Sequence, residues 1–132
     1  MYLLDTNACI RILNGWAPLV ERFRAHRTTD LRLCSVVKAE LIFGARRSAH
    51  PAENLRTLSR FFQPFVSLPF DDECAEACGA IREQLARTGR PIGPNDLLIA
   101  ATATRHALDL VTHNVTEFSQ VIGLRVVDWE NE

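Results

Sequence analysis

Met1-Tyr2-Leu3-Leu4-Asp5-Thr6-Asn7 opens the chain, and this stretch decides the expected fold. Residues 2–5 are predicted to form a buried strand, which leads into a short helix over 8–13 that stops near Asn14-Gly15. A strand followed at once by a helix favours an α/β fold. It also places the Asp5 carboxylate at the carboxyl end of the strand, where such folds bind their ligands.

The rest of the chain alternates between strands and helices in the same way. Further strands are expected at 31–34, 66–68, 110–112 and, at an edge, 125–127. Helices are expected over 18–26, from an N-cap at Ser35 to about 48, then over 52–62, 72–88, 94–106 and 117–121. Strands separated by helices pair in parallel through right-handed crossovers. We therefore expect one domain over 1–132, with a central parallel sheet of four to five strands between helices on both faces.

The composition is that of a single globular domain. The chain has 132 residues, of which 47% are apolar, enough for a core without disulfides. Its longest strongly apolar stretch, 96–104, is too short to cross a bilayer, and the N-terminus lacks the features of a signal peptide. A soluble, cytoplasmic protein with no membrane contact is expected.

The four cysteines, Cys9, Cys34, Cys74 and Cys78, are expected to be reduced thiols in or near the core. Cys74 and Cys78 lie four apart on a predicted helix, which suits a metal. No second Cys or His pair at zinc spacing accompanies them, and the four histidines are too scattered to predict a metal site.

The charge neither indicates nor excludes a nucleic-acid partner. The net charge is −1, and fourteen of the fifteen basic residues are arginines, Lys38 being the single lysine. Guanidinium groups suit bidentate phosphate contacts. A coding bias toward arginine explains the same excess equally well.

Three carboxylates stand in apolar surroundings: Asp5, Glu40 and Asp96. Each has a structural alternative, because Asp5 can cap a helix, Glu40 can pair with Arg46 or Arg47, and Asp96 can favour the dipole of its helix. Together they would repel one another and raise one another's pKa. A hard divalent cation such as Mg²⁺ or Mn²⁺ relieves that repulsion and can activate water against a phosphodiester.

Four blocks of sequence carry a family resemblance: Leu4 to Asn7, Ser35 to Leu41 with Gly44, Ile92 to Ala101, and Leu110 to Phe118. In this order and at these spacings they resemble the PIN-domain ribonucleases, specifically the VapC toxins of bacterial toxin–antitoxin modules. The resemblance covers essentially the whole chain. It implies a PIN-like fold and an endoribonuclease toxin that cleaves structured RNA, with transfer RNA as the favoured target.

The resemblance also implies roles for particular residues. Asp5, Glu40 and Asp96 would hold Mg²⁺ or Mn²⁺, with Thr6 and Asn7 in support. PIN domains often have an Asp where this chain has Asn114, and many VapC proteins have one where it has Glu117. We expect Glu117 to supply the fourth carboxyl group and Asn114 to be a supporting polar group.

Expectations about the substrate come from single residues, and those about the partners come from the family resemblance. Arg11, Arg46 and Arg47 are candidates for binding phosphates, with exposed solubilising charge as the alternative. Similarity to VapC implies a homodimer and a VapB-type antitoxin that blocks the acidic cleft, in a complex that binds operator DNA. The aromatic residues Phe61, Phe62, Phe65 and Phe70 suit either a partner surface or the core.

The competing class is a binding or signalling module. A receiver-like domain would use Asp5 as a phosphate acceptor, but it would also need an acidic pair before its first helix and a lysine at a late strand end, which Lys38 does not provide. A catalytically inactive PIN-like scaffold is the second alternative.

Overall fold

A computed structural model describes residues 1–131. Its centre is one parallel sheet of five strands in the order β3-β2-β1-β4-β5. The strands are β1 (Tyr2–Leu4), β2 (Leu31–Cys34), β3 (Val66–Leu68), β4 (Asp109–Val111) and β5 (Val126–Val127). The predicted fold class, with a parallel sheet of four to five strands, is confirmed.

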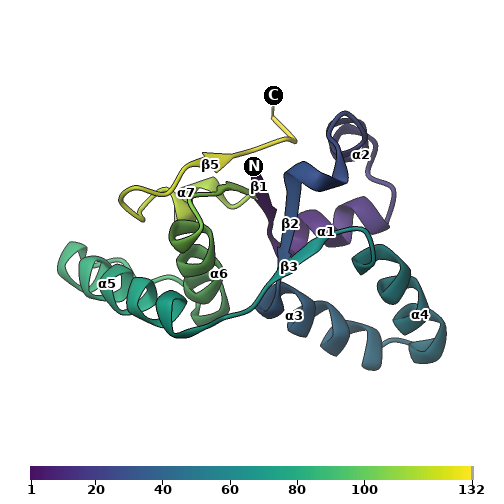
Figure 1. Ribbon diagram of the computed structural model, residues 1–132, viewed down its shortest axis with the longest axis horizontal. Helices are drawn as coiled ribbons and strands as arrows, with labels where there is room; N and C mark the ends of the chain where they lie inside the picture. Colours follow the sequence, from purple (N-terminus) through teal and green to yellow (C-terminus); the bar gives the residue numbers. More distant parts are fainter. Residues whose placement is uncertain (132) are drawn as a thin grey trace.

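Seven α-helices and one 3-10 turn connect the strands. They are α1 (Thr6–Leu13), α2 (Ala17–Arg24), the 3-10 turn Thr28–Asp30, α3 (Ser35–Arg46), α4 (Pro51–Phe62), α5 (Asp72–Thr88), α6 (Pro94–Arg105) and α7 (Val115–Phe118). Figure 1 shows α1 to α4 on one side of the sheet and α5 and α6 on the other. This division follows from right-handed crossovers, because the chain moves from β1 toward β3 and then returns past β1 to β4.

The three middle strands are buried on both faces. Leu3 and Leu4 in β1, Leu33 in β2 and Leu110 in β4 have no exposed surface. Near-continuous apolar strands are typical of parallel sheets covered by helices on both sides. The core continues into α6, where residues 99–103 are fully buried.

Several boundaries differ from the predicted ones by one to three residues, and the differences at α3 and α7 concern helices that border the candidate site. Ser35 is not the N-cap of α3, because Cys34 is extended and holds that position, without a side-chain cap. The last short helix runs over Val115–Phe118, after Asn114 as N-cap, instead of over 117–121.

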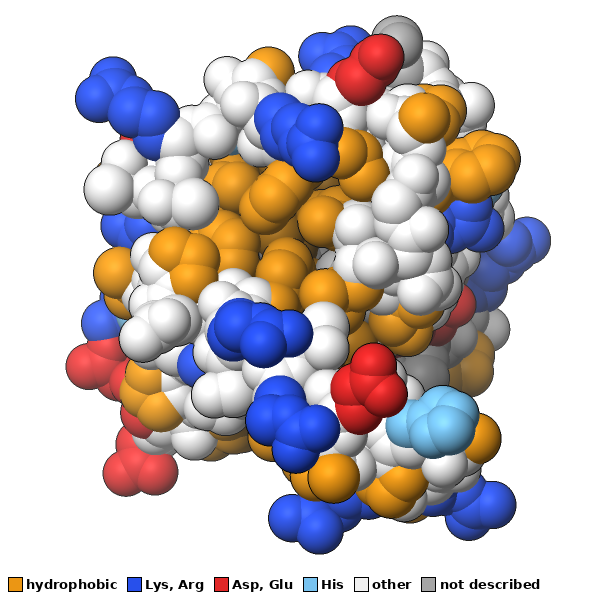
Figure 2. Space-filling view, turned by 90° about the vertical axis from the view of Figure 1, so that its right-hand side faces the viewer, with side chains coloured by type: hydrophobic (Ala, Val, Ile, Leu, Met, Phe, Trp, Pro, Cys, Tyr) orange, Lys and Arg blue, Asp and Glu red, His pale blue; other side chains and the backbone are white. Residues whose placement is uncertain are grey.

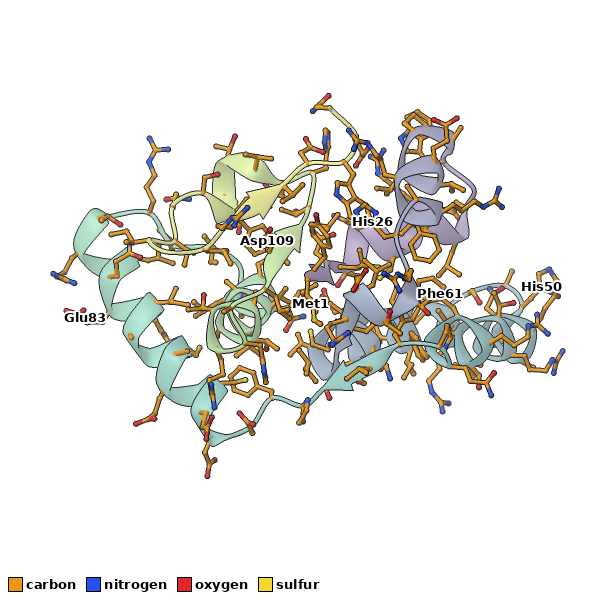
Figure 3. All side chains as sticks on the ribbon, turned by 45° about the horizontal axis from the view of Figure 1, so that its top comes forward. Met1, His26, His50, Phe61, Glu83 and Asp109 are labelled. Carbon is orange, nitrogen blue, oxygen red and sulfur yellow. The ribbon has the colours of Figure 1, made fainter. Side chains whose placement is uncertain are left out.

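The cysteines and four of the phenylalanines lie in or against the core. All four cysteines are free, and Cys78 alone is not fully buried. Phe65 is buried, and Phe61, Phe62 and Phe70 pack against the core while partly exposed. Figure 3 shows Phe61 close to the body of the domain and His50 at the outer end of the α3–α4 pair. These phenylalanines therefore belong mainly to the core.

The C-terminal segment packs across the first strand. The Trp129 ring is buried and stacks on His26, just after α2, at 4.7 Å between ring centroids, with Tyr2 against both rings. No helix within residues 1–131 combines the length and the apolar character that crossing a bilayer requires.

Candidate metal-binding active site

The candidate site lies where the order of the sheet reverses. Strands β1 and β4 are parallel neighbours, so their carboxyl ends meet, and the Asp5 amide donates to the Val111 carbonyl at 3.1 Å. Asp5 follows the first of these strands and Thr112 the second. A crevice at such a reversal is the usual place for a ligand in an open parallel sheet.

Asp5 is buried and caps the first helix. Its Oδ1 accepts a hydrogen bond of 2.8 Å from the Ala8 amide, which makes it the N-cap of α1. The pKa of Asp5 is raised to about 6, chiefly by burial and to a smaller extent by the charges of Glu130 and Glu40, while hydrogen bonds from Thr112 and Ala8 act to lower it. The capping alternative is therefore correct, and it leaves Oδ2 outside the cap.

Glu40 reaches the site from α3. Its Oε1 accepts a hydrogen bond of 2.5 Å from the Thr6 hydroxyl at the start of α1. The alternative in which Glu40 pairs with Arg46 or Arg47 has no support, because none of the ion pairs within residues 1–131 joins them. Thr6 thus ties Glu40 to the helix that Asp5 begins.

Asp96 lies in the first turn of α6, two residues after Pro94. Burial is the largest cause that raises its pKa to about 6, followed by the charges of Glu117, Asp5 and Glu40. The four carboxyl groups therefore lie within electrostatic reach of one another, although they come from four separate parts of the chain.

Glu117 on α7 faces Asp96 and is held at both oxygens. Oε1 accepts a hydrogen bond of 2.9 Å from the Gly93 amide, and Oε2 accepts one of 2.7 Å from the Asn114 side chain. A Cβ built on Gly93 would lie 3.8 Å from Asp96 Oδ2 and 4.0 Å from Glu117 Oε1, so both acids border this backbone segment. The structure thus brings Glu117 and Asn114 together with the three acids.

The charge of this cluster is not balanced by basic side chains. None of the ion pairs in the described part of the chain includes Asp5, Glu40, Asp96 or Glu117. Crowded carboxylates without a basic partner suit a divalent cation, and the pKa values of Asp5 and Asp96 are raised here. The donors are all oxygens, which fits Mg²⁺ or Mn²⁺ better than zinc.

A second group of side chains at the same edge was missed by the sequence analysis. His113, Asp128 and Glu130 offer ligand atoms within 4.8 Å of one another, the only such trio among residues 1–131. Its members already have partners: His113 Nδ1 lies 3.1 Å from Asp128 Oδ2, and Arg11 pairs with Glu130 at 2.8 Å. The sequence did offer a signal. Residues 128–130 directly follow the predicted edge strand at 125–127, and His113 directly follows the predicted strand at 110–112.

The arginine candidates fall into two groups. Arg11 is committed to Glu130 and also lies over the Trp16 ring. Arg46 and Arg47 are exposed at the end of α3, where the Arg47 guanidinium lies 5.7 Å from the centroid of the Phe43 ring. Asn7 is exposed on the rim of a cleft that Thr6 and Glu40 also line.

Lys38 does not approach Asp5 in the manner of a receiver domain. Its ammonium lies 4.9 Å from the centroid of the Phe62 ring on α4. Asp5 itself is 5% exposed, which leaves little room for phosphorylation by a partner. The receiver-like interpretation is therefore set aside.

Comparison with known proteins identifies related chains of the same length. The PIN domain family model matches residues 2–124. The chain is 42% identical over 129 residues to the tRNA(fMet)-specific endonuclease VapC of Shigella flexneri, with 97% of each chain covered.

Two solved structures match at similar coverage. One is DNA-bound VapBC from Salmonella typhimurium, with a TM-score of 0.89, 37% identity and 97% of each chain covered. The other is VapBC2 from Rickettsia felis bound to a DNA fragment from its promoter, with a TM-score of 0.89 and 30% identity over 97% of this chain and 98% of that one.

Proposed function

The chain belongs to the PIN-domain family, among its VapC ribonucleases, and from that premise we propose that it cleaves tRNA(fMet) with a divalent metal held by Asp5, Glu40 and Asp96. The observation that carries the metal part is the unbalanced cluster of carboxyl groups at the carboxyl ends of β1 and β4. The substrate part rests on two relatives, 42% and 39% identical, that bear this name.

The metal would be Mg²⁺ or Mn²⁺. Asp5 would offer Oδ2, since Oδ1 receives the Ala8 amide. When bound, such an ion lowers the pKa of water and stabilises charge on a phosphodiester. Because Mg²⁺ keeps several waters, a few carboxylates can hold it without a full cage of protein ligands.

The neighbouring residues would orient the site. Thr6 fixes Glu40 through its hydroxyl, and Asn114 with the Gly93 amide fixes Glu117 beside Asp96. Glu117 would act as the fourth carboxyl group, directly on the metal or through a water. Partners that orient ligands typically contribute 10- to 100-fold in metal affinity or activity.

The RNA would lie across the cleft beside Glu40. Arg46 and Arg47, exposed near the end of α3, would contact phosphates, and Asn7 would contact the substrate at the rim. Arg11 is a weaker candidate than the sequence suggests, because its guanidinium is already paired with Glu130.

A VapB-type antitoxin would bind the adjacent apolar face. Figure 2 shows hydrophobic side chains gathered in a hollow on the side of α2 and α4, edged by basic side chains. A groove between α1, α3 and α4 is lined by Leu13, Leu41 and Leu58, and it shares Ile10 and Glu40 with the acidic cleft. A peptide in this groove would therefore extend directly into the proposed active site.

The assembly proposed is a cytoplasmic homodimer of this chain with a VapB-type antitoxin that binds operator DNA. It is supported by the solved relatives, which are VapBC complexes bound to DNA. A basic side chain of the antitoxin would suit the acidic cluster, which has no basic partner within residues 1–131.

The test is cleavage of transfer RNA by the purified protein. The expected result is cleavage of tRNA(fMet), and not of an elongator tRNA, in Mg²⁺ or Mn²⁺, with loss of activity in EDTA and in Asp96→Asn. The 5′ ends of the fragments would identify the cleaved bond. Absence of metal-dependent cleavage in a folded preparation would instead support the inactive scaffold, and cleavage unaffected by EDTA would contradict the metal.

A further inference from the structure

Phe43 is an exposed aromatic residue beside the acidic cleft. It has 64% of its surface exposed, and it lies three residues after Glu40 on α3, so both side chains are on the same face of the helix. Single exposed apolar residues are ordinary on a protein surface. The position of Phe43, and not its exposure alone, therefore needs an explanation.

The cleft around Phe43 has both polar and apolar walls. Its volume is about 740 Å³, and beside Phe43 and Glu40 it is lined by four hydroxyl or amide side chains and four aliphatic ones: Thr6, Ser35, Asn7 and Asn95, and Ile10, Val36, Ala39 and Leu98. The groove between α1, α3 and α4 has a similar mixture of residues, but its lining includes no aromatic residue. A single exposed aromatic ring with amide and hydroxyl groups in the same cleft suits a ligand that is flat and polar at its edges.

A basic group completes this surface. The Arg47 guanidinium lies 5.7 Å from the centroid of the Phe43 ring, one helical turn further along α3. An aromatic face for a base next to a cation for a phosphate is the usual arrangement in proteins that bind unpaired nucleotides. Glu40, on the other side of Phe43 along the helix, belongs to the proposed metal site.

We propose that Phe43 stacks on an unpaired nucleobase of the RNA next to the scissile phosphate, while Arg47 contacts a neighbouring phosphate. This inference rests on the proposed ribonuclease function. It makes Phe43 a substrate-contacting residue that selects RNA whose bases are free to leave a helix, since a paired base cannot present its face to the ring.

The experiment measures binding of fluorescently labelled tRNA(fMet) to the full chain in an Asp96→Asn background, which prevents cleavage. Phe43→Ala is expected to weaken binding roughly 10-fold or more, the usual effect of removing one stacking aromatic residue. Phe43→Leu is expected to weaken it as much, because leucine keeps the apolar bulk and loses the aromatic face. Phe43→Tyr and Phe43→Trp are expected to bind within a few-fold of the parent.

The matched control is Ile122→Ala, which removes an apolar side chain that is 76% exposed and outside the cleft. It is expected to bind RNA like the parent. In the Asp96-containing protein, Phe43→Ala should raise KM for cleavage more than it lowers kcat, whereas a general loss of fold would lower both the active fraction and the melting temperature.

Three results would overturn the proposal. Equal binding by Phe43→Ala and the parent would exclude a contact with the RNA. Parent-like binding by Phe43→Leu would exclude stacking. Loss of the homodimer in Phe43→Ala, measured by light scattering and with RNA binding restored at high protein concentration, would assign the residue to the contact between copies. If the wild-type chain cleaves tRNA(fMet), each of these results concerns Phe43 alone and leaves the proposed function intact.

Discussion

The Asn114 side chain donates a hydrogen bond of 2.7 Å to Glu117 Oε2. This contact lies between the N-cap residue of α7 and the third residue of the same helix. With the Gly93 amide on the other oxygen, Glu117 is held beside Asp96 without a basic residue. The amide thus orients an acid and adds no further negative charge to the cluster.

Replacement of Asn114 tests this arrangement. Asn114→Ala is expected to lower kcat/KM and the affinity for Mg²⁺ by 10- to 100-fold, because Glu117 loses the donor that orients it. Asn114→Asp is expected to weaken metal-free stability, since a second carboxylate would face Glu117. Metal titrations and steady-state cleavage measure both. Thr116→Ala, an exposed change on the same helix, is the control, and an equal loss there would point to a general effect on α7.

Asp96→Asn separates catalysis from stability. We expect loss of cleavage together with an unchanged or raised melting temperature in metal-free buffer, because the substitution removes a charge that Glu117, Asp5 and Glu40 all oppose. Wild-type protein should gain thermal stability when Mn²⁺ is added, and the variant should gain less. A clear fall in the metal-free melting temperature of Asp96→Asn would contradict the crowding of negative charge at the site. The control is Asp72→Asn, which removes the charge of an exposed carboxylate on α5.

The capping role of Asp5 and its proposed metal-binding role can be tested separately. Asp5→Asn keeps a side-chain oxygen for the Ala8 amide and should leave the cap of α1 intact, whereas Asp5→Ala removes it and should cost about 1 kcal/mol more in the free energy of unfolding. Both variants should lack metal-dependent cleavage. Denaturant unfolding gives the difference, and equal stabilities would show that the cap contributes little.

The pH dependence of stability has a definite sign. The pKa values of Asp5 and Asp96 are raised from 3.8 to about 6 in the folded protein, so between those values the folded state binds more protons than the unfolded state. Stability of the metal-free protein should therefore fall as pH rises from about 4 to about 6 and change little above. The measurement is the melting temperature of the wild type minus that of Asp5→Asn/Asp96→Asn at each pH, which removes the contributions of other groups.

Metal affinity should change in the opposite direction. Because bound carboxylates must be deprotonated, affinity for Mn²⁺ is expected to fall as pH drops through about 6. Calorimetric titration at several pH values measures this, with release of protons on binding near pH 6. A pH-independent affinity between 5 and 7 would contradict the raised pKa values.

The elements that the sequence predicts best are bounded by clear signals. The bounds of β2, β3 and α5 are as predicted. Short apolar runs mark the two strands, and Gly89, the C-cap of α5, marks the end of the helix. The four-residue helix α7 was misplaced, since it has barely one turn and shows no periodicity. At α3 the Ser35 hydroxyl suggested an N-cap, but Ser35 is the first helical residue and the extended Cys34 is the N-cap.

The candidate site was predictable in its acids and not in its contacts. Asp5, Glu40 and Asp96 stand out because carboxylates among apolar residues are unusual. The bond from Thr6 to Glu40 joins residues 34 positions apart, and the pair of Arg11 with Glu130 joins residues 119 apart. Such pairs are fixed by the packing of the sheet and leave no local pattern in the sequence.

The pairing of the first strand with the end of the chain has a consequence for biosynthesis. β1 is the middle strand, with β4 as one neighbour, and Trp129 covers Tyr2. The first strand therefore lacks one of its two neighbours until β4 has left the ribosome, and Tyr2 lacks its aromatic cover until Trp129 has followed. The sheet of this domain can close only after most of its strands and helices have been synthesised.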